Sequence, residues 1–137
     1  MRSAVALLAV VIVTAVHAQS LPPGPLPELR GSSIGYSSVE EALEALKTKP
    51  GTQVRDESGW TIIADRESAS ERTLWAFTPP GHPAHPAAVK RIVTERDGTI
   101  YLDMKVLCQA RKEPCDQLVR DFQALNDSVR QQFGPSP

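Results

Sequence analysis

The strongest constraint on the fold is the Asp97-Gly98 dipeptide, which separates two runs of β-forming residues. Asp-Gly is a favoured sequence for the two-residue turn of a β-hairpin, because both turn positions need positive φ. After the turn, Ile100, Leu102, Met104, Val106 and Cys108 alternate with Tyr101, Asp103, Lys105 and Leu107. Such alternation predicts a strand with one face on a core and one in water. We therefore predict an antiparallel hairpin with strands over residues 88–95 and 99–108.

The register of this hairpin stays open at the level of sequence. A strict two-residue turn places Arg91 and Glu95 on the same face as Leu102 and Met104. A slip of one position places Ile92 on that face instead, because a one-residue shift exchanges the two faces of a strand. We expect a bulge near the turn.

Two amphipathic helices flank the strand-rich section. The first is predicted to begin after Ser38, since Ser38 and Glu41 have the spacing of a capping box, and to end at Pro50-Gly51. Its apolar face consists of Val39, Ala42, Leu43 and Leu46. The second is predicted over residues 114–133. Its apolar stripe consists of Cys115, Leu118, Val119, Phe122, Leu125, Val129 and Phe133, spaced as one side of a helix.

Further strands are predicted over residues 60–64 and 73–78, with a short additional strand over 52–54. Consecutive strands joined by short loops favour an antiparallel meander. The element order α-β-β-β-β-α predicts an α+β fold, a two-layer sandwich in which a four- to five-stranded meander carries both helices on one face. The domain is expected to span residues 36–134.

The N-terminus has the composition of a secretory signal peptide over residues 1–18. Arg2 precedes an apolar run over residues 4–13, and small residues Val16 and Ala18 precede the expected cleavage site. The apolar run is too short to span a bilayer of about 30 Å. We predict cleavage after Ala18, an exported protein that is periplasmic or secreted, and a proline-rich linker over residues 19–35.

Cys108 and Cys115 are the two cysteines of the chain. An even cysteine count in an exported chain favours a disulfide, and their spacing differs from the C-x-x-C of redox enzymes. If both thiols face the core, the bond joins the last helix to the edge of the sheet. The closed loop is short, so the expected stabilisation is about 2–3 kcal/mol.

The charge balance excludes some classes of partner. The formal net charge is −1 for the whole chain and becomes more negative when Arg2 leaves with the signal peptide. The sequence has no excess of basic residues of the kind that binds nucleic acid or an anionic membrane surface. No second apolar run is long enough to span a membrane. An envelope protein or a cell-wall component remains as the expected partner.

The loop of residues 78–86 is the most unusual stretch, with His82 and His85 among four prolines. Two imidazoles three residues apart could ligate copper or zinc, but a structural zinc needs four ligands and a catalytic zinc three protein ligands. A stiffened connection between strands and a recognition loop are the alternatives. We expect both histidines to be exposed and close to Trp75, and we expect no metal and no cofactor.

Catalytic signatures are lacking. The chain contains no G-x-S-x-G motif and no cysteine outside the predicted pair, so we assign no catalytic residue and do not predict an enzyme. Trp60 and Trp75 lie on strands that could be neighbours. They could stack on a ligand from an open sheet face or pack in the core.

The stretches Trp60-Thr61-Ile62-Ile63-Ala64-Asp65 and Leu74-Trp75-Ala76-Phe77-Thr78-Pro79-Pro80-Gly81-His82-Pro83-Ala84-His85-Pro86 resemble small, uncharacterised exported proteins of Gram-negative bacteria. This resemblance implies export, and it carries no activity and no binding residues. From the sequence we predict a non-enzymatic binding or accessory module with His82, His85, Trp75 and Trp60 as its candidate binding residues. The alternative is a metal-binding protein or an enzyme that uses His82 and His85.

Overall fold

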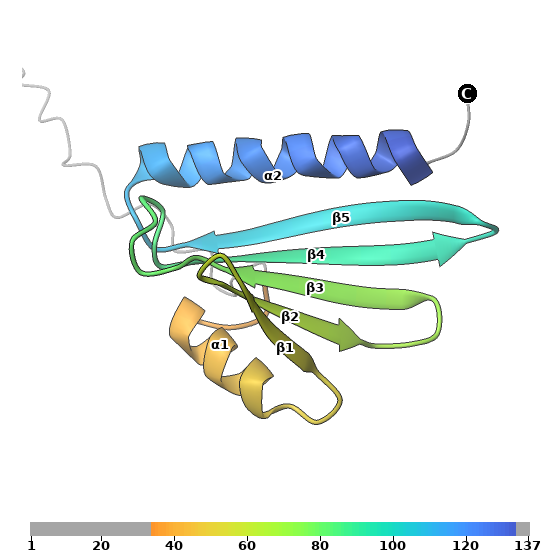
Figure 1. Cartoon of the computed structure of the whole chain (residues 1–137), viewed down its shortest axis with the longest axis horizontal. Coiled ribbons are helices and arrows are strands. Elements are labelled where there is room, and N and C mark those ends of the chain that lie inside the picture. The colour runs from red at the N-terminus through yellow and green to blue at the C-terminus, as the bar shows by residue number, and fades with distance from the viewer. Residues whose placement is uncertain (1–33, 134–137) are drawn as a thin grey trace, which may run out of the picture.

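The computed structural model describes residues 34–133, in which two helices enclose a run of five strands (Figure 1). The elements are α1 (Val39–Thr48), β1 (Gln53–Glu57), β2 (Trp60–Arg66), β3 (Glu71–Phe77), β4 (Ala87–Arg96), β5 (Thr99–Cys108) and α2 (Lys112–Phe133). The predicted signal peptide and residues 19–33 of the predicted linker lie outside the described residues. Ile34, which the sequence assigned to the linker, is 1% exposed and packs in the core, so the packed domain includes it.

The five strands form one antiparallel sheet in the order β1-β2-β3-β4-β5. Every strand therefore pairs with its neighbours in the chain, and the predicted meander and α+β class are confirmed, with five strands. Among residues 34–133, neither helix combines the length and the apolar character that a membrane crossing requires.

The β4–β5 hairpin has the strict two-residue register. Arg96 pairs with Thr99 and Arg91 pairs with Met104, and the pairing is unbroken along both strands. The expected bulge is therefore wrong. The turn closes without an extra residue because Asp97 and Gly98 both adopt positive φ, 52° and 75°, as a type I′ turn requires.

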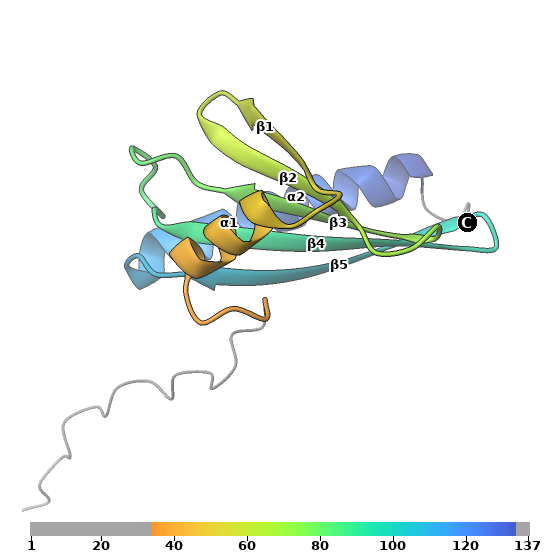
Figure 2. The same ribbon diagram turned by 90° about the horizontal axis from the view of Figure 1, so that it is seen from below.

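The two helices lie on opposite faces of the sheet, which corrects the prediction that both cover one face (Figures 1 and 2). The reason is visible in β3, whose two sides are both apolar. Trp75 and Phe77 belong to the core beneath α1, whereas Ala76 belongs to the core beneath α2. A strand that is buried on both faces needs a covering layer on each side, so the fold has three layers.

The core on the α1 side, here called the α1 cluster, consists of Ile34, Val39, Ala42, Leu46, Ile63, Trp75, Phe77 and Ala88. Ser38 caps α1 as predicted, since its side chain accepts a hydrogen bond from the Glu41 N–H at 3.1 Å. The Glu41 carboxylate accepts a hydrogen bond from the backbone N–H of Ser37 at 2.9 Å. The cap thus fixes the start of α1, and the buried side chains Val39, Ala42 and Leu46 place its apolar side on the sheet.

The core on the α2 side, the α2 cluster, consists of Ala76, Ala84, Ala87, Val89 and Leu118, with partly buried side chains around it. The predicted disulfide between Cys108 and Cys115 is present, with a Cα–Cα distance of 5.8 Å. It joins the last residue of β5 to the first turns of α2. The sulfur of Cys108 also lies 3.5 Å from the carbonyl oxygen of Ala84, so the disulfide contacts the proline-rich loop.

The inward side of α2 differs in part from the predicted stripe. Leu118 is buried as expected, but Leu125 is 45% exposed and the buried position of that turn is Asn126. The Asn126 side-chain amide faces the sulfur of Met104 at 3.5 Å. Arg130 donates to the carbonyl oxygen of Leu102 at 2.7 Å. These contacts hold the second half of α2 over β5.

Candidate functional site

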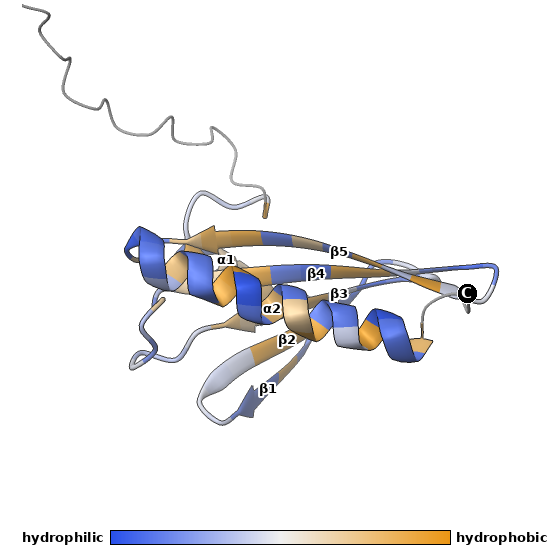
Figure 3. Cartoon of the chain, turned by 90° about the horizontal axis from the view of Figure 1, so that it is seen from above, coloured by the Kyte–Doolittle hydropathy of each residue, from blue (hydrophilic) through white to orange (hydrophobic). Residues whose placement is uncertain are grey.

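Part of the sheet surface on the α2 side is not covered by α2. Figure 3 shows the helix running over the side of the sheet that contains β4 and β5, while β1 and much of β2 lie clear of it. The cross-strand pairs Gln53–Ala64, Ala64–Leu74 and Arg66–Arg72 identify the side chains on this surface. We call it the open face, and it consists of Gln53, Arg55, Glu57, Trp60, Ile62, Ala64, Arg66, Arg72 and Leu74.

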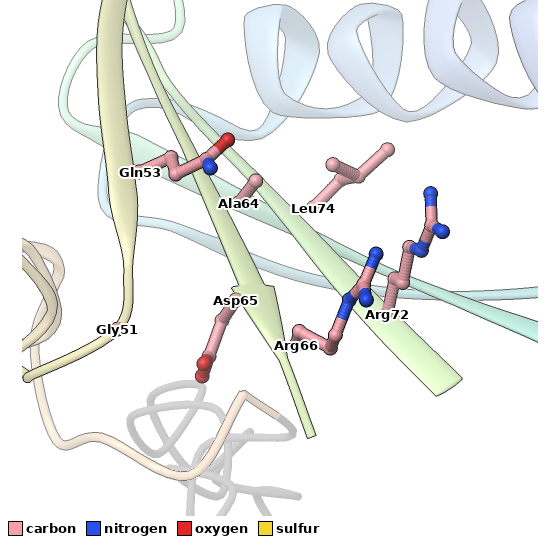
Figure 4. Close-up of a pocket in the computed structure, with 7 residues that line it drawn as sticks. All are labelled: Gly51, Gln53, Ala64, Asp65, Arg66, Arg72 and Leu74. Carbon is pink, nitrogen blue, oxygen red and sulfur yellow. The ribbon is translucent and has the colours of Figure 1, made fainter. Parts of the chain in front are cut away.

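A cavity of about 330 Å³ opens on this face (Figure 4). It is lined by Gly51, Gln53, Ala64, Asp65, Arg66, Arg72 and Leu74. Its volume lies at the lower end of the range of small-molecule sites, roughly 300–1,000 Å³. Ala64 and Leu74 are half-buried and form the apolar part of the lining. The cavity thus combines a small apolar surface with polar groups at its margin.

Asp65 contributes to the lining, but its carboxylate points away from the two arginines (Figure 4). It is only 5% exposed and forms an ion pair with Lys49, which follows α1. The hydrogen bond from Lys49 to Asp65 raises the pKa of the Lys49 ammonium above its usual value. The negative charge of Asp65 is therefore compensated on the α1 side of the sheet.

Arg66 and Arg72 stand directly opposite each other on β2 and β3. Both side chains are exposed, and neither takes part in any of the ion pairs found within residues 34–133. Like charges in directly opposite positions destabilise an antiparallel sheet. We call these two residues the arginine pair. They concentrate positive charge at one end of the open face.

Arg91 adds a third positive charge nearby, because it lies on β4 opposite Leu74. Its guanidinium carbon is 5.6 Å from the ring centroid of Phe122 on α2, a cation–π arrangement. The Nε atom of Arg91 is buried and has no hydrogen-bond partner among the described residues. Burial lowers the pKa of this guanidinium, which nonetheless stays charged at neutral pH.

The other end of the open face is aromatic. The Trp60 ring meets the His82 ring edge-on, with centroids 5.1 Å apart, and meets the Phe122 ring at 5.9 Å. Trp60 and His82 are both half-buried. The structure thus brings together two of the four candidate binding residues and places them beside α2.

The loop that carries the histidines is fixed by its own hydrogen bonds. Nδ1 of His82 accepts the N–H of Ala84 at 3.1 Å. Nδ1 of His85 lies 3.1 Å from the hydroxyl of Thr78 and 3.0 Å from its carbonyl oxygen. His85 is exposed as expected, whereas His82 is not. Within residues 34–133, no three His, Cys, Asp or Glu side chains gather as a metal site would need.

Trp75 does not join this surface. It is 3% exposed in the α1 cluster, where its ring contacts Tyr36 and Phe77 and lies beneath Lys90. The tryptophan that contacts His82 is Trp60 rather than Trp75. The physical reason is strand alternation: Trp75 pairs with Ile63, and Trp60, three residues before Ile63, points to the opposite face.

Sequence reasoning missed the arginine pair. Arg66 and Arg72 are separated by five residues that include Ser68, Ala69 and Ser70, and the hairpin brings them opposite each other. Their symmetric placement about a turn-forming segment is the signal that could have revealed the pair, provided that the strands extend to both arginines. The predicted strands ended at residue 64 and began at residue 73, so both arginines were left in the loop.

No family model matches the chain, and no curated protein or solved structure shows a significant match to it. The open face and the loop of residues 78–86 are therefore the features from which a function is inferred.

Proposed function

We propose that this chain is a small exported binding module without enzymatic activity, and that a component of the cell envelope binds to its open face. The observation that carries the proposal is the incomplete cover of the sheet by α2. Ile62, Ala64 and Leu74 remain half-exposed there, around a cavity of about 330 Å³. A formed cavity with an apolar lining and a few convergent polar groups is the usual setting for a ligand.

Two features support the exported location. The N-terminal residues have the composition of a signal peptide, and Cys108 and Cys115 are paired. Disulfides persist in oxidising compartments and are rare in the cytosol. The ligand is accordingly an envelope protein or a cell-wall component, encountered in the periplasm or outside the cell.

The alternative function is metal binding or catalysis by His82 and His85. In its favour, Thr78 holds the His85 ring through Nδ1, and a hydrogen bond at one ring nitrogen commonly orients a metal-binding imidazole. Against it, two histidines fall short of the three protein ligands of a catalytic zinc. Metal analysis of the purified protein separates the two functions, because stoichiometric copper or zinc that is lost in His82→Ala/His85→Ala would favour the alternative.

Site-specific photo-crosslinking tests the proposal directly. A photoreactive amino acid replaces Leu74, on the open face, and in a matched variant it replaces Tyr101, which is 51% exposed and lies on the other side of the sheet. Irradiation in the native host should give an adduct of discrete mass from position 74 and none from position 101. An absence of adducts at position 74, or equal labelling at both positions, would refute binding at the open face.

A further inference from the structure

We infer that the arginine pair, Arg66 and Arg72, is an oxyanion subsite of the open face, so that the ligand presents a carboxylate or a phosphate group there. This inference rests on the proposed function, because it names the chemistry of the ligand that the open face binds.

The geometry of the pair suits a single oxyanion. Directly opposite residues of an antiparallel pair have Cβ atoms about 4.5–5.5 Å apart. Figure 4 shows both guanidinium groups extending from neighbouring strands toward the same side of the cavity. Arginine presents several N–H donors in a planar fork that matches the oxygens of carboxylate and phosphate. Two such forks from adjacent strands can donate to one bound group.

The charge distribution around the pair points to a negative ligand. Two cations close to the cavity are paired with carboxylates: on the adjacent strand, Arg55 is 2.7 Å from Glu57, and Lys49 is paired with Asp65. Arg66 and Arg72 face each other, and within residues 34–133 neither forms an ion pair with a carboxylate. A bound oxyanion would replace their mutual repulsion with charge-assisted hydrogen bonds, which are stronger than neutral ones.

Arg91 strengthens the positive potential at this end of the sheet. It lies opposite Leu74 on the next strand, on the same side as the arginine pair, and its Nε atom lacks a partner within the described part of the chain. Because its guanidinium is partly withdrawn from water beneath Phe122, its charge is less screened than that of an exposed arginine.

The rest of the lining indicates what accompanies the acidic group. Ala64 and Leu74 separate the arginine pair from Ile62 and Trp60 along the open face. A ligand whose oxyanion lies between the arginines therefore places its adjoining atoms on an apolar surface. The structure thus favours an acid with an apolar portion over a fully hydrophilic polyanion.

The test is a titration of the full-length mature chain, labelled with nitrogen-15, with three probes. Hexanoate combines a carboxylate with an apolar chain, hexanamide is its neutral analogue, and inorganic phosphate carries the other oxyanion. Hexanoate should shift the amide resonances of β2 and β3 around the arginine pair saturably. Because hydrogen bonds to charged groups are the strong ones, hexanamide should bind about tenfold more weakly or worse.

The variant Arg66→Gln/Arg72→Gln should bind hexanoate no better than hexanamide. The matched control is Arg96→Gln/Arg111→Gln, which removes the same net charge from exposed positions outside the cavity and should leave hexanoate binding unchanged. Tighter binding of phosphate than of hexanoate, lost in the same variant, supports a phosphate-bearing ligand. The reverse order supports a carboxylate.

Equal binding of hexanoate and hexanamide at the open face would overturn the inference and leave the proposed function standing. An equal loss of binding in both double variants would also overturn it, since the effect would then be a general one of charge. A lack of resonance shifts with all three probes overturns the subsite as well. The crosslink from position 74 then decides the proposed function separately.

Discussion

Removal of the Cys108–Cys115 disulfide should weaken the domain by an amount that follows from its geometry. The bond closes a loop with a sequence separation of 7 residues. For a loop of this length, the chain-entropy relation gives about 2.4 kcal/mol at 25 °C. Both cysteines are half-buried beside the α2 cluster, so serine can replace them without leaving a large void. Cys108→Ser/Cys115→Ser should therefore lose about 2–3 kcal/mol of unfolding free energy and keep the fold.

Urea denaturation, followed by far-ultraviolet circular dichroism, measures this loss. With an m-value in the usual range for small proteins, the midpoint should fall by about 1–2 M urea. The slope of the transition should stay nearly constant, because the same surface is exposed on unfolding. Near-ultraviolet spectra of the variant in water should match those of the parent chain, because the α2 cluster remains packed.

A reductant provides the matched control. The parent chain treated with a phosphine reductant should unfold at the midpoint of the double variant, and the variant should not respond to the reductant. If reduction left the urea midpoint of the parent chain unchanged, the reasoning would be refuted, because the crosslink would then not restrict the unfolded state. A double variant that is unfolded in water would also refute it, since the disulfide would then stabilise the fold by more than the entropy of loop closure.

Four further outcomes are expected. Leu118→Ala should lose about 2–5 kcal/mol of unfolding free energy, because Leu118 is buried in the α2 cluster. Leu125→Ala, at a position that is 45% exposed, should lose much less, and equal losses of the two variants in urea titrations would contradict the assigned inward side of α2. Arg72→Gln should leave the unfolding free energy unchanged or raise it by about 0.2–1 kcal/mol, because it removes a like-charge cross-strand pair. A clear loss of unfolding free energy in the same assay would contradict electrostatic repulsion between Arg66 and Arg72. The hydrogen bond to Asp65 raises the pKa of Lys49, so this ion pair stabilises the fold fully below the unfolded pKa of lysine, about 10.4, and its contribution is lost as the pH rises through the higher folded pKa. Melting temperatures should therefore fall in that alkaline range for the parent chain and change less for Asp65→Asn. Identical alkaline profiles of the two proteins would contradict a stabilising Lys49–Asp65 ion pair. Intact-mass measurement of protein from the native host should give a chain that begins at Gln19, and a retained Met1 would remove the basis for export.

Local signals in the sequence predicted most of the fold. Asp97-Gly98 located the hairpin turn, and the alternation after it located β5 over residues 99–108, as observed. Ser38 marked the start of α1 because its side chain caps the helix. The cysteine count predicted the disulfide. Each of these features depends on residues close together in the chain, so their physics can be evaluated without the tertiary structure.

The features that the sequence did not predict depend on which side of the sheet an element covers. Leu74 and Ala76 alternate with Trp75 and Phe77 on β3, and this pattern of two apolar sides already implied a strand buried on both faces. The prediction of a single covered face instead followed from the alternation of β5, which has one apolar side and one polar side. Trp75 was offered as a ligand contact for the same reason, since its burial follows only from the position of α1.

The open face could not be predicted because it depends on strand ends and on a helix position. Arg66 and Arg72 become neighbours only if β2 and β3 extend past the apolar residues that define them. Hydrophobic patterning stops at those apolar residues, whereas the backbone hydrogen bonds of the sheet continue to Arg66 and Glu71. That α2 leaves β1 and much of β2 uncovered likewise depends on where the helix lies on the sheet. The hydrophobic periodicity of the sequence does not determine that position.

The strictly sequential order of the strands has a consequence for how the chain folds. Every strand pair joins neighbours in the chain, so each pairing closes only a short loop and the entropy of closure stays small. Low sequence separation between contacting residues is associated with fast folding, and we expect this domain to fold rapidly for a β-rich protein. Each hairpin can therefore form its cross-strand pairs without waiting for a distant segment of the chain.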